Sequence, residues 1–306
     1  MEPRLWRAVR GKLAAVLRLW ACALVLASAC GQPQKRDRGF ADGEDEGGGP
    51  FTAAANFEPV AFEVEVTGPD DGRPIILIPG LACPGDVWKE TVAHLGDAYQ
   101  AHVLTLAGFA GVERIDEPIS KAVRRDLTRY IRSRKLKDPV IVGHSMGGFI
   151  AFWIASYHPE LVGPVIIVDA SPALSGGLEE AKELRTKWRK ASDEVFAAQV
   201  RAKFSAMTHD AKRMAPVIDQ IAKSDRKVIG DAIYEMIMTD LRSEVPNIKA
   251  PVLILAADGG LQSRIREQTK DIPDHQLIVI RGAAHFVMWD QPEAFFAAVD
   301  RFLAEH

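Results

Sequence analysis

Short, continuous apolar runs constrain the fold of this chain more than any other feature of its sequence. Runs of that kind fit strands that are buried on both faces of a parallel sheet, because neither face of such a strand needs polar residues. An alternating segment, VAFEVEV at 60–66, precedes them and predicts a half-exposed antiparallel strand. The runs are IILI (75–78), HVLTL (102–106), VIV (140–142), VIIV (165–168), VLIL (252–255) and LIVI (277–280).

Helical patterns separate these runs, so strands and helices alternate along the chain. That alternation predicts an α/β fold with a doubly wound, mostly parallel sheet. The interval from Leu178 to about Asp240 breaks the alternation, since it contains amphipathic helical stretches and no strand-like run. We interpret it as a helical cap, at about residues 172–248, inserted between two strands. The other predicted helices cover 87–95, 119–134, 146–157, 261–270 and 292–303.

The composition is that of a globular protein without a nucleic-acid partner. Of the 306 residues, 47% are hydrophobic, which suffices for a sizeable core. The formal net charge is -3 and the basic residues are scattered among acidic ones, so no basic surface for nucleic acid is expected. The cysteines and histidines show no paired spacing of metal ligands, and we expect no metal and no cofactor.

The N-terminus has the layout of a secretory signal peptide. Basic residues precede the apolar run LWACALVLASAC, which is too short and too interrupted for a comfortable membrane span, since a span needs about 20 apolar residues. The end of the run, LASAC, resembles a bacterial lipobox, in which Cys30 would carry lipid and become the first mature residue. An ordinary signal peptide with an incidental cysteine is the alternative.

These features divide the chain into three parts. We predict a signal peptide of the lipoprotein type at 1–30, a flexible linker at 31–58 and an α/β domain at 59–306. The linker is rich in glycine and charge and has little to bury. We therefore expect an exported bacterial protein, either a cell-envelope lipoprotein attached to a membrane through its N-terminal lipid or a periplasmic or secreted protein.

The stretch PVIVGHSMGGFIAF, at 139–152, places G-x-S-x-G directly after a buried strand and directly before a helix. This is the context that a nucleophile elbow requires. Such a turn strains the backbone of the serine, and Gly143 and Gly147 leave space where a Cβ atom would strike the neighbouring strand or helix. Ser145 would then stand at a helix N-terminus, where free N–H groups favour an oxyanion. We interpret Ser145 as a nucleophile.

A serine nucleophile needs a base and donors for the oxyanion. The segment IRGAAHFVMWDQPEAF supplies His285 between the last strand and the last helix, and the order of serine before histidine is the hydrolase order. One oxyanion donor would be the N–H of Met146. The second is expected from the loop after an early strand, where LIPGLACPGDVW offers the N–H of Leu81. A plain strand-to-helix loop is the alternative reading of that segment.

These motifs, together with VIIVDASP, resemble the α/β-hydrolase superfamily, in its single-domain form with a helical cap. The resemblance covers roughly Val60 to the C-terminus. It implies that Ser145 is the nucleophile, His285 the base, and Met146 and Leu81 the oxyanion donors. A serine at the elbow argues against epoxide hydrolase and dehalogenase chemistry, for which the superfamily places an aspartate there.

Two departures from the superfamily pattern matter. Pro79-Gly80 replaces the usual His-Gly before the oxyanion turn, and LILAADGG replaces the usual Gly-x-x-Asp after the penultimate strand. The acid of the triad is therefore open between two residues. Asp258 follows the strand that usually bears the acid but comes about two residues early. Asp169 ends the strand after the nucleophile helix, at an alternative site that some members use, and we prefer it.

The sequence thus predicts a serine hydrolase that cleaves an ester-like carbonyl of a small molecule through an acyl-enzyme, without a cofactor. Lactone hydrolysis, C–C bond hydrolysis and perhydrolysis use the same triad and are the alternatives. A non-catalytic ligand-binding member is less favoured, because Ser145 and His285 are both present.

Overall fold

The computed structural model describes residues 57–306, which form a seven-stranded sheet in the order β1-β3-β2-β4-β5-β6-β7. β1 pairs antiparallel with β3, and the remaining pairs are parallel. The prediction of a doubly wound, mostly parallel sheet with one antiparallel strand is confirmed. The strands are β1 (Phe62–Thr67), β2 (Arg73–Ile78), β3 (Tyr99–Leu106), β4 (Val140–His144), β5 (Val165–Val168), β6 (Val252–Ala257) and β7 (His275–Ile280).

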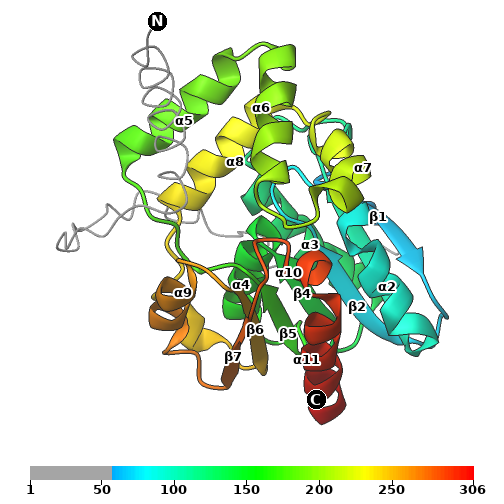
Figure 1. The fold of residues 1–306 in the computed structure, drawn as a ribbon. Coiled ribbons are helices and arrows are strands. Elements are labelled where there is room, and N and C mark those ends of the chain that lie inside the picture. Colours follow the sequence, from blue (N-terminus) through cyan, green and yellow to red (C-terminus); the bar gives the residue numbers. More distant parts are fainter. Residues whose placement is uncertain (1–56) are drawn as a thin grey trace, which may run out of the picture. The chain divides into compact units, whose positions relative to one another are not determined.

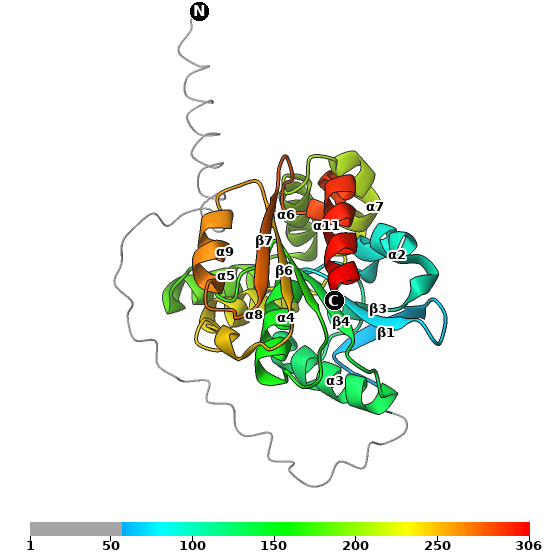
Figure 2. The same ribbon diagram turned by 90° about the horizontal axis from the view of Figure 1, so that it is seen from below.

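Helices cover both faces of the sheet, which explains why its central strands lack alternation. β4 and β5 are buried along their whole length. α2 (Lys89–Leu95) and α11 (Pro292–Glu305) lie on one face, and the other face carries α3, α4 and α9 (Figure 2). These three are α3 (Ile119–Arg134), α4 (Met146–Tyr157) and α9 (Gln262–Thr269); short elements are α10 (Val287–Asp290), η1 (Gly85–Trp88), η2 (Gly96–Ala98) and η3 (Val245–Asn247).

Four consecutive helices are inserted between β5 and β6, and they lie together beyond the carboxyl ends of the strands (Figure 1). An isolated antiparallel bridge between Ala173 and Asp240 joins the chain where it enters and leaves this segment. The helical cap therefore lies over the edge of the sheet where parallel α/β proteins place their ligands. Its helices are α5 (Leu178–Lys190), α6 (Asp193–Ser205), α7 (Ala211–Ile221) and α8 (Arg226–Met238).

The predicted signal peptide at 1–30, its Cys30 and most of the predicted linker at 31–58 lie outside the described residues. Among residues 57–306, no helix is long and apolar enough to cross a membrane.

Candidate active site

Ser145 is the single residue between the end of β4 and the start of α4. Its backbone has φ 54° and ψ −116°, a region that costs a residue with a side chain about 1–3 kcal/mol. A Cβ atom on Gly143 would lie 2.2 Å from the Gly147 carbonyl oxygen, and one on Gly147 would lie 2.2 Å from the Ile78 carbonyl oxygen. Both glycines are therefore required for the close approach of strand and helix, and the tight turn holds Ser145 at the helix N-terminus.

The loop after β2 lies directly against this turn. A Cβ atom on Gly80 would be 3.2 Å from the Ser145 Cβ atom, and the Cys83 N–H closes the loop by donating to the Gly80 carbonyl at 3.0 Å. Within residues 57–306, no hydrogen bond engages the N–H of Leu81. The N–H of Met146, the first residue of α4, has no acceptor within its helix. Two backbone donors beside Ser145, one in the loop after β2 and one at the start of α4, are thus left for a ligand.

Asp169 and His285 form the closest polar contact of the site. Asp169 Oδ2 lies 2.6 Å from His285 Nδ1, and Asp169 Oδ1 accepts the Ala257 N–H at 3.0 Å. Burial alone would raise the pKa of the Asp169 carboxyl, but the hydrogen bond and the charge of His285 hold this pKa below its usual value. Asp169 follows β5 with φ 45°, a left-handed conformation that aspartate tolerates better than most residues.

His144 joins the elbow to the loop of His285. Its Nε2 lies 2.9 Å from the His285 carbonyl oxygen, and the two rings are 4.7 Å apart. A carbonyl only accepts, so Nε2 of His144 carries the hydrogen. Burial is the main cause that lowers the pKa of His144 to about 3, and the nearby His285 lowers this pKa further. The His144 ring therefore stays neutral beside the His285 ring. The residue before Ser145 therefore positions His285 through its backbone.

Asp258 has a different environment from Asp169. Its Oδ2 accepts the Gly282 N–H at 3.2 Å, and its own N–H donates to the Ala283 carbonyl at 3.1 Å. Within residues 57–306, no hydrogen bond or ion pair joins Asp258 to His285. Asp258 links the loops that follow β6 and β7, whereas Asp169 contacts the imidazole itself.

Asp290, which the sequence did not single out, binds the loop of His285 from the other side. Its Oδ2 accepts the Ala284 N–H at 2.8 Å. Its Oδ1 accepts the Thr208 hydroxyl at 2.6 Å and the His209 N–H at 2.9 Å, both from the loop between α6 and α7. One carboxylate thus connects the cap to the residue before His285. The only sequence signal was its position within the His285 segment.

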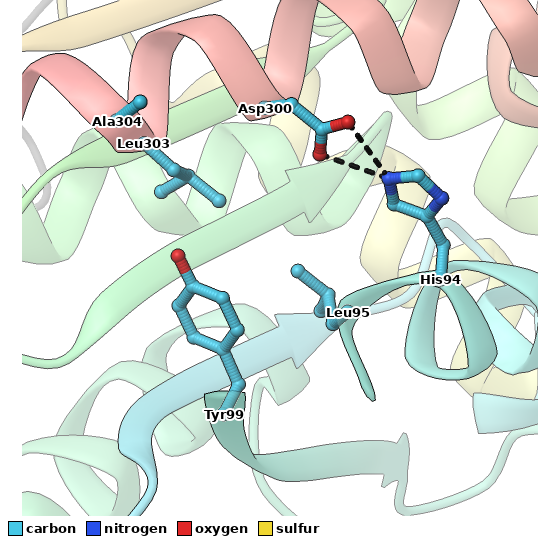
Figure 3. A pocket seen from close by; sticks show the side chains of 6 residues that line it. All are labelled: His94, Leu95, Tyr99, Asp300, Leu303 and Ala304. Atoms are coloured by element: carbon cyan, nitrogen blue, oxygen red, sulfur yellow. Dashed lines mark hydrogen bonds and ion pairs between the residues drawn. The ribbon is translucent and has the colours of Figure 1, made fainter. Parts of the chain in front are cut away.

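Residues 57–306 contain no evident metal site, and a cavity that they form lies away from Ser145. In the described part of the chain, no group of three or more His, Cys, Asp and Glu side chains is placed to hold a metal ion. A cavity of about 220 Å³ lies beside α2 and α11, where His94 Nε2 is 2.8 Å from Asp300 Oδ1 (Figure 3). Neither Ser145, Asp169 nor His285 lines it. The His94–Asp300 contact fastens the two helices to each other.

Comparison with known proteins finds hydrolases among the relatives of this chain. A family model described as "Alpha/beta hydrolase family" matches residues 75–299. Pimeloyl-[acyl-carrier protein] methyl ester esterase of Edwardsiella ictaluri is 25% identical over 244 residues, which are 75% of this chain and 93% of that protein. N-formylmaleamate deformylase of Pseudomonas putida is 26% identical over 243 residues, 76% of this chain and 89% of that protein.

A solved structure supports the fold. The enol-lactonase of Burkholderia xenovorans LB400 superimposes with a TM-score of 0.72 and 20% sequence identity, covering 79% of this chain and 96% of that chain. The match extends over nearly the whole neighbour.

Proposed function

This chain belongs to the alpha/beta hydrolase family, and on that premise we propose that it is a serine hydrolase acting on carboxylic esters. The observation that carries the proposal is the 2.6 Å contact between Asp169 and His285, beside a strained serine turn. A carboxylate on Nδ1 fixes the imidazole in the tautomer whose Nε2 can accept a proton. The esterases among the relatives support ester hydrolysis.

In the first half of the reaction, Ser145 attacks the ester carbonyl. Nε2 of His285 takes the hydroxyl proton as the bond between Oγ and the carbonyl carbon forms. The carbonyl oxygen becomes an oxyanion, which the N–H groups of Leu81 and Met146 stabilise. The tetrahedral intermediate then releases the alcohol, which receives the proton from His285, and the acyl group remains on Ser145.

In the second half, water replaces the alcohol. His285 takes a proton from water as the water oxygen attacks the acyl carbon, and the same donors stabilise the second oxyanion. Collapse returns the proton to Ser145 and releases the carboxylic acid. Asp169 stays ionised throughout and stabilises the imidazolium that forms twice.

The nucleophile is tested by labelling with a fluorophosphonate, which reacts with activated serines. We expect intact-mass analysis to show one adduct on the wild type and none on Ser145→Ala, with ester hydrolysis lost in the variant. An active wild type that takes up no label, or equal labelling of the two proteins, would refute the assignment.

Lactones are a second substrate class, because a lactone is a cyclic ester and passes through the same steps. Its alcohol stays attached to the acyl group, so the product is a single hydroxy acid. Similarity to a solved enol-lactonase favours including this class. Parallel rates on p-nitrophenyl esters of graded chain length and on lactones of graded ring size decide between the two classes.

We propose further that the chain is exported and anchored by lipid on Cys30. The basic segment, the apolar run and the LASAC sequence support this proposal. In a bacterial expression host, Cys30→Ser should move the protein from the membrane fraction to the soluble fraction. Recovery of an intact N-terminus with unmodified Cys30 would contradict both export and anchoring.

A further inference from the structure

Lys203 in the last turn of α6 carries a charge that the described residues do not balance. Its side chain is half-buried, and within residues 57–306 its ammonium group forms no hydrogen bond or ion pair. Burial lowers the pKa of Lys203, and the positive charge of Lys187 on α5 lowers it further. Protein therefore partly covers this ammonium group without supplying an anion.

Several other basic residues of the cap form ion pairs with carboxylates. Arg185 and Arg189 share the Asp231 carboxylate, at 2.6 and 2.7 Å. Further pairs are Arg201 with Asp219, Arg226 with Asp193, Lys182 with Glu179, and Arg213 with Glu90. These cap cations are therefore neutralised by carboxylates, whereas Lys203 is not. An uncompensated ammonium group that protein surrounds is costly, because the group loses part of its hydration.

The C-terminal end of α6 lies at the loop that carries His285. Phe204, the neighbour of Lys203, has its ring 6.1 Å from that of Phe286, which follows His285. Beyond α6, the Thr208 hydroxyl donates to Asp290 at the end of α10, the short helix that follows His285 and Phe286. Lys203 is therefore carried on the part of the cap that contacts the proposed catalytic machinery.

A second polar group with open hydrogen-bonding capacity lies one turn earlier on α6. Gln199 is four residues before Lys203, so the two side chains project from the same flank of the helix. The buried Oε1 of Gln199 has no hydrogen-bond partner among the described residues. Oxygen and nitrogen of an amide are exchanged by rotating the group, so Gln199 can present an N–H to an anion that Lys203 attracts.

We propose that Lys203 binds a carboxylate that the substrate carries away from its scissile ester, so that the preferred substrates are anionic esters. A side chain that is surrounded by protein and still reached by water can exchange its water for a ligand anion. Charge-assisted hydrogen bonds of this kind are about twice as strong as neutral ones. The proposal rests on the proposed ester hydrolysis and adds the charge of the substrate to it.

The test compares matched esters that differ in one charge. The full chain is assayed with p-nitrophenyl monoesters of dicarboxylic acids, over a graded series of chain lengths, and with the neutral alkanoate esters of equal length. We expect the wild type to prefer an anionic ester, and Lys203→Met to lower kcat/KM for that ester about tenfold or more, mainly through KM. Activity of the variant on neutral esters should change little, and Lys203→Arg should retain most of the preference.

Lys212→Met, at an exposed lysine of α7, is the matched control and should leave the preference unchanged. If Lys203 only stabilised the last turn of α6, where a cation interacts favourably with the helix dipole, Lys203→Met would lower the thermal stability. The ratio of kcat/KM between the anionic and the neutral ester would then stay unchanged. That result, or a wild type without preference at any chain length, overturns the proposal while ester hydrolysis stands. No hydrolysis of either series and no labelling of Ser145 would instead refute the proposed function.

Discussion

The carboxyl edge of the sheet and the cap above it are held in different ways. At the sheet edge, backbone packs against backbone so tightly that a Cβ atom on Gly147 would lie 2.2 Å from a carbonyl oxygen. Ser145 and Asp169 both adopt positive φ there. In the cap, side chains at the surface form many of the links between helices, as in the pair of Arg201 on α6 with Asp219 on α7.

This difference separates the chemistry from the recognition of the substrate. Strained backbone persists only where its surroundings leave no other conformation, and such places can hold reacting groups in fixed positions. Surface ion pairs contribute about 0–1 kcal/mol each, so single changes in the cap are tolerated. We therefore expect the sheet edge to determine whether the enzyme works, and the cap to determine which substrate it accepts.

The largest expected effect is that of Asp169→Asn. The amide would favour the wrong imidazole tautomer and leave the imidazolium without a counter-charge, so kcat should fall about 10³- to 10⁴-fold. Asp258→Asn is the matched control, because that carboxylate contacts Gly282 and not His285. Steady-state kinetics on protein confirmed folded by circular dichroism measure both effects.

A severe loss in Asp258→Asn alone would show that the loop after β6 supplies the acid during turnover. Modest losses in both single variants, with a severe loss in the double variant, would indicate that the two carboxylates replace each other.

The second effect concerns Glu235 of α8, which joins the cap to the core. Its carboxylate accepts the Ser120 N–H at 3.2 Å at the start of α3. Burial raises the pKa of Glu235 from 4.5 to about 7. The folded state therefore binds a proton more tightly than the unfolded state, and the free energy of unfolding should fall as pH rises from 4.5 to about 7.

Glu235→Gln tests this dependence on pH. The amide keeps an acceptor for Ser120 and cannot ionise, so the fall, which amounts to at most about 3 kcal/mol, should largely disappear. Urea denaturation at about pH 5 and about pH 8 measures the change, and Glu183→Gln at an exposed position of α5 is the control. The same pH dependence in wild type and Glu235→Gln would contradict the role of Glu235.

The third effect is that of Asp290→Asn, again at the boundary between cap and sheet edge. The variant keeps one acceptor oxygen, so it cannot serve both Ala284 and the cap loop, and the stability should fall by about 1–3 kcal/mol. Because Ala284 precedes His285, kcat should fall about tenfold. Thr208→Val removes one of the two contacts on the cap side, leaves the His209 N–H in place, and should reduce kcat less. Equal losses of kcat in the two variants would show that the cap contact alone matters.

Much of the fold could be predicted from the sequence, because burial on both faces leaves a local pattern. The expected strand at 102–106 was nevertheless too short, since β3 begins at Tyr99. The first residues of β3 are only half-buried, so they need not be apolar. The short helix α10 was also missed, because four residues are too few to show helical periodicity.

Only part of the site could be predicted from the sequence, because several of its contacts join residues that are far apart in the chain. The strand–turn–helix context of Ser145 is local and could be read directly. Whether Asp169 or Asp258 contacts His285 depends on the path of loops far apart in sequence, and on a left-handed turn at Asp169 that spacing does not encode. The contacts of His144 with the His285 carbonyl and of Asp290 with the cap are tertiary in the same sense.

The smallest expected effect is that of Arg201→Gln, which breaks the ion pair between α6 and α7. Arg201 Nε lies 2.8 Å from Asp219 Oδ1, but both side chains are largely exposed, at 48% and 62%. Water and salt screen such a pair, so the loss of stability should stay below about 1 kcal/mol and should shrink further at high salt. Neither kcat nor the preference between anionic and neutral esters should change, because Arg201 already has a carboxylate partner, in contrast to Lys203. Thermal unfolding at low and high salt, with the paired ester assay, measures both quantities. A loss of catalysis as large as that of Asp290→Asn would show that the surface pairs of the cap position the catalytic loop, and that the division between a fixed sheet edge and a tolerant cap is wrong.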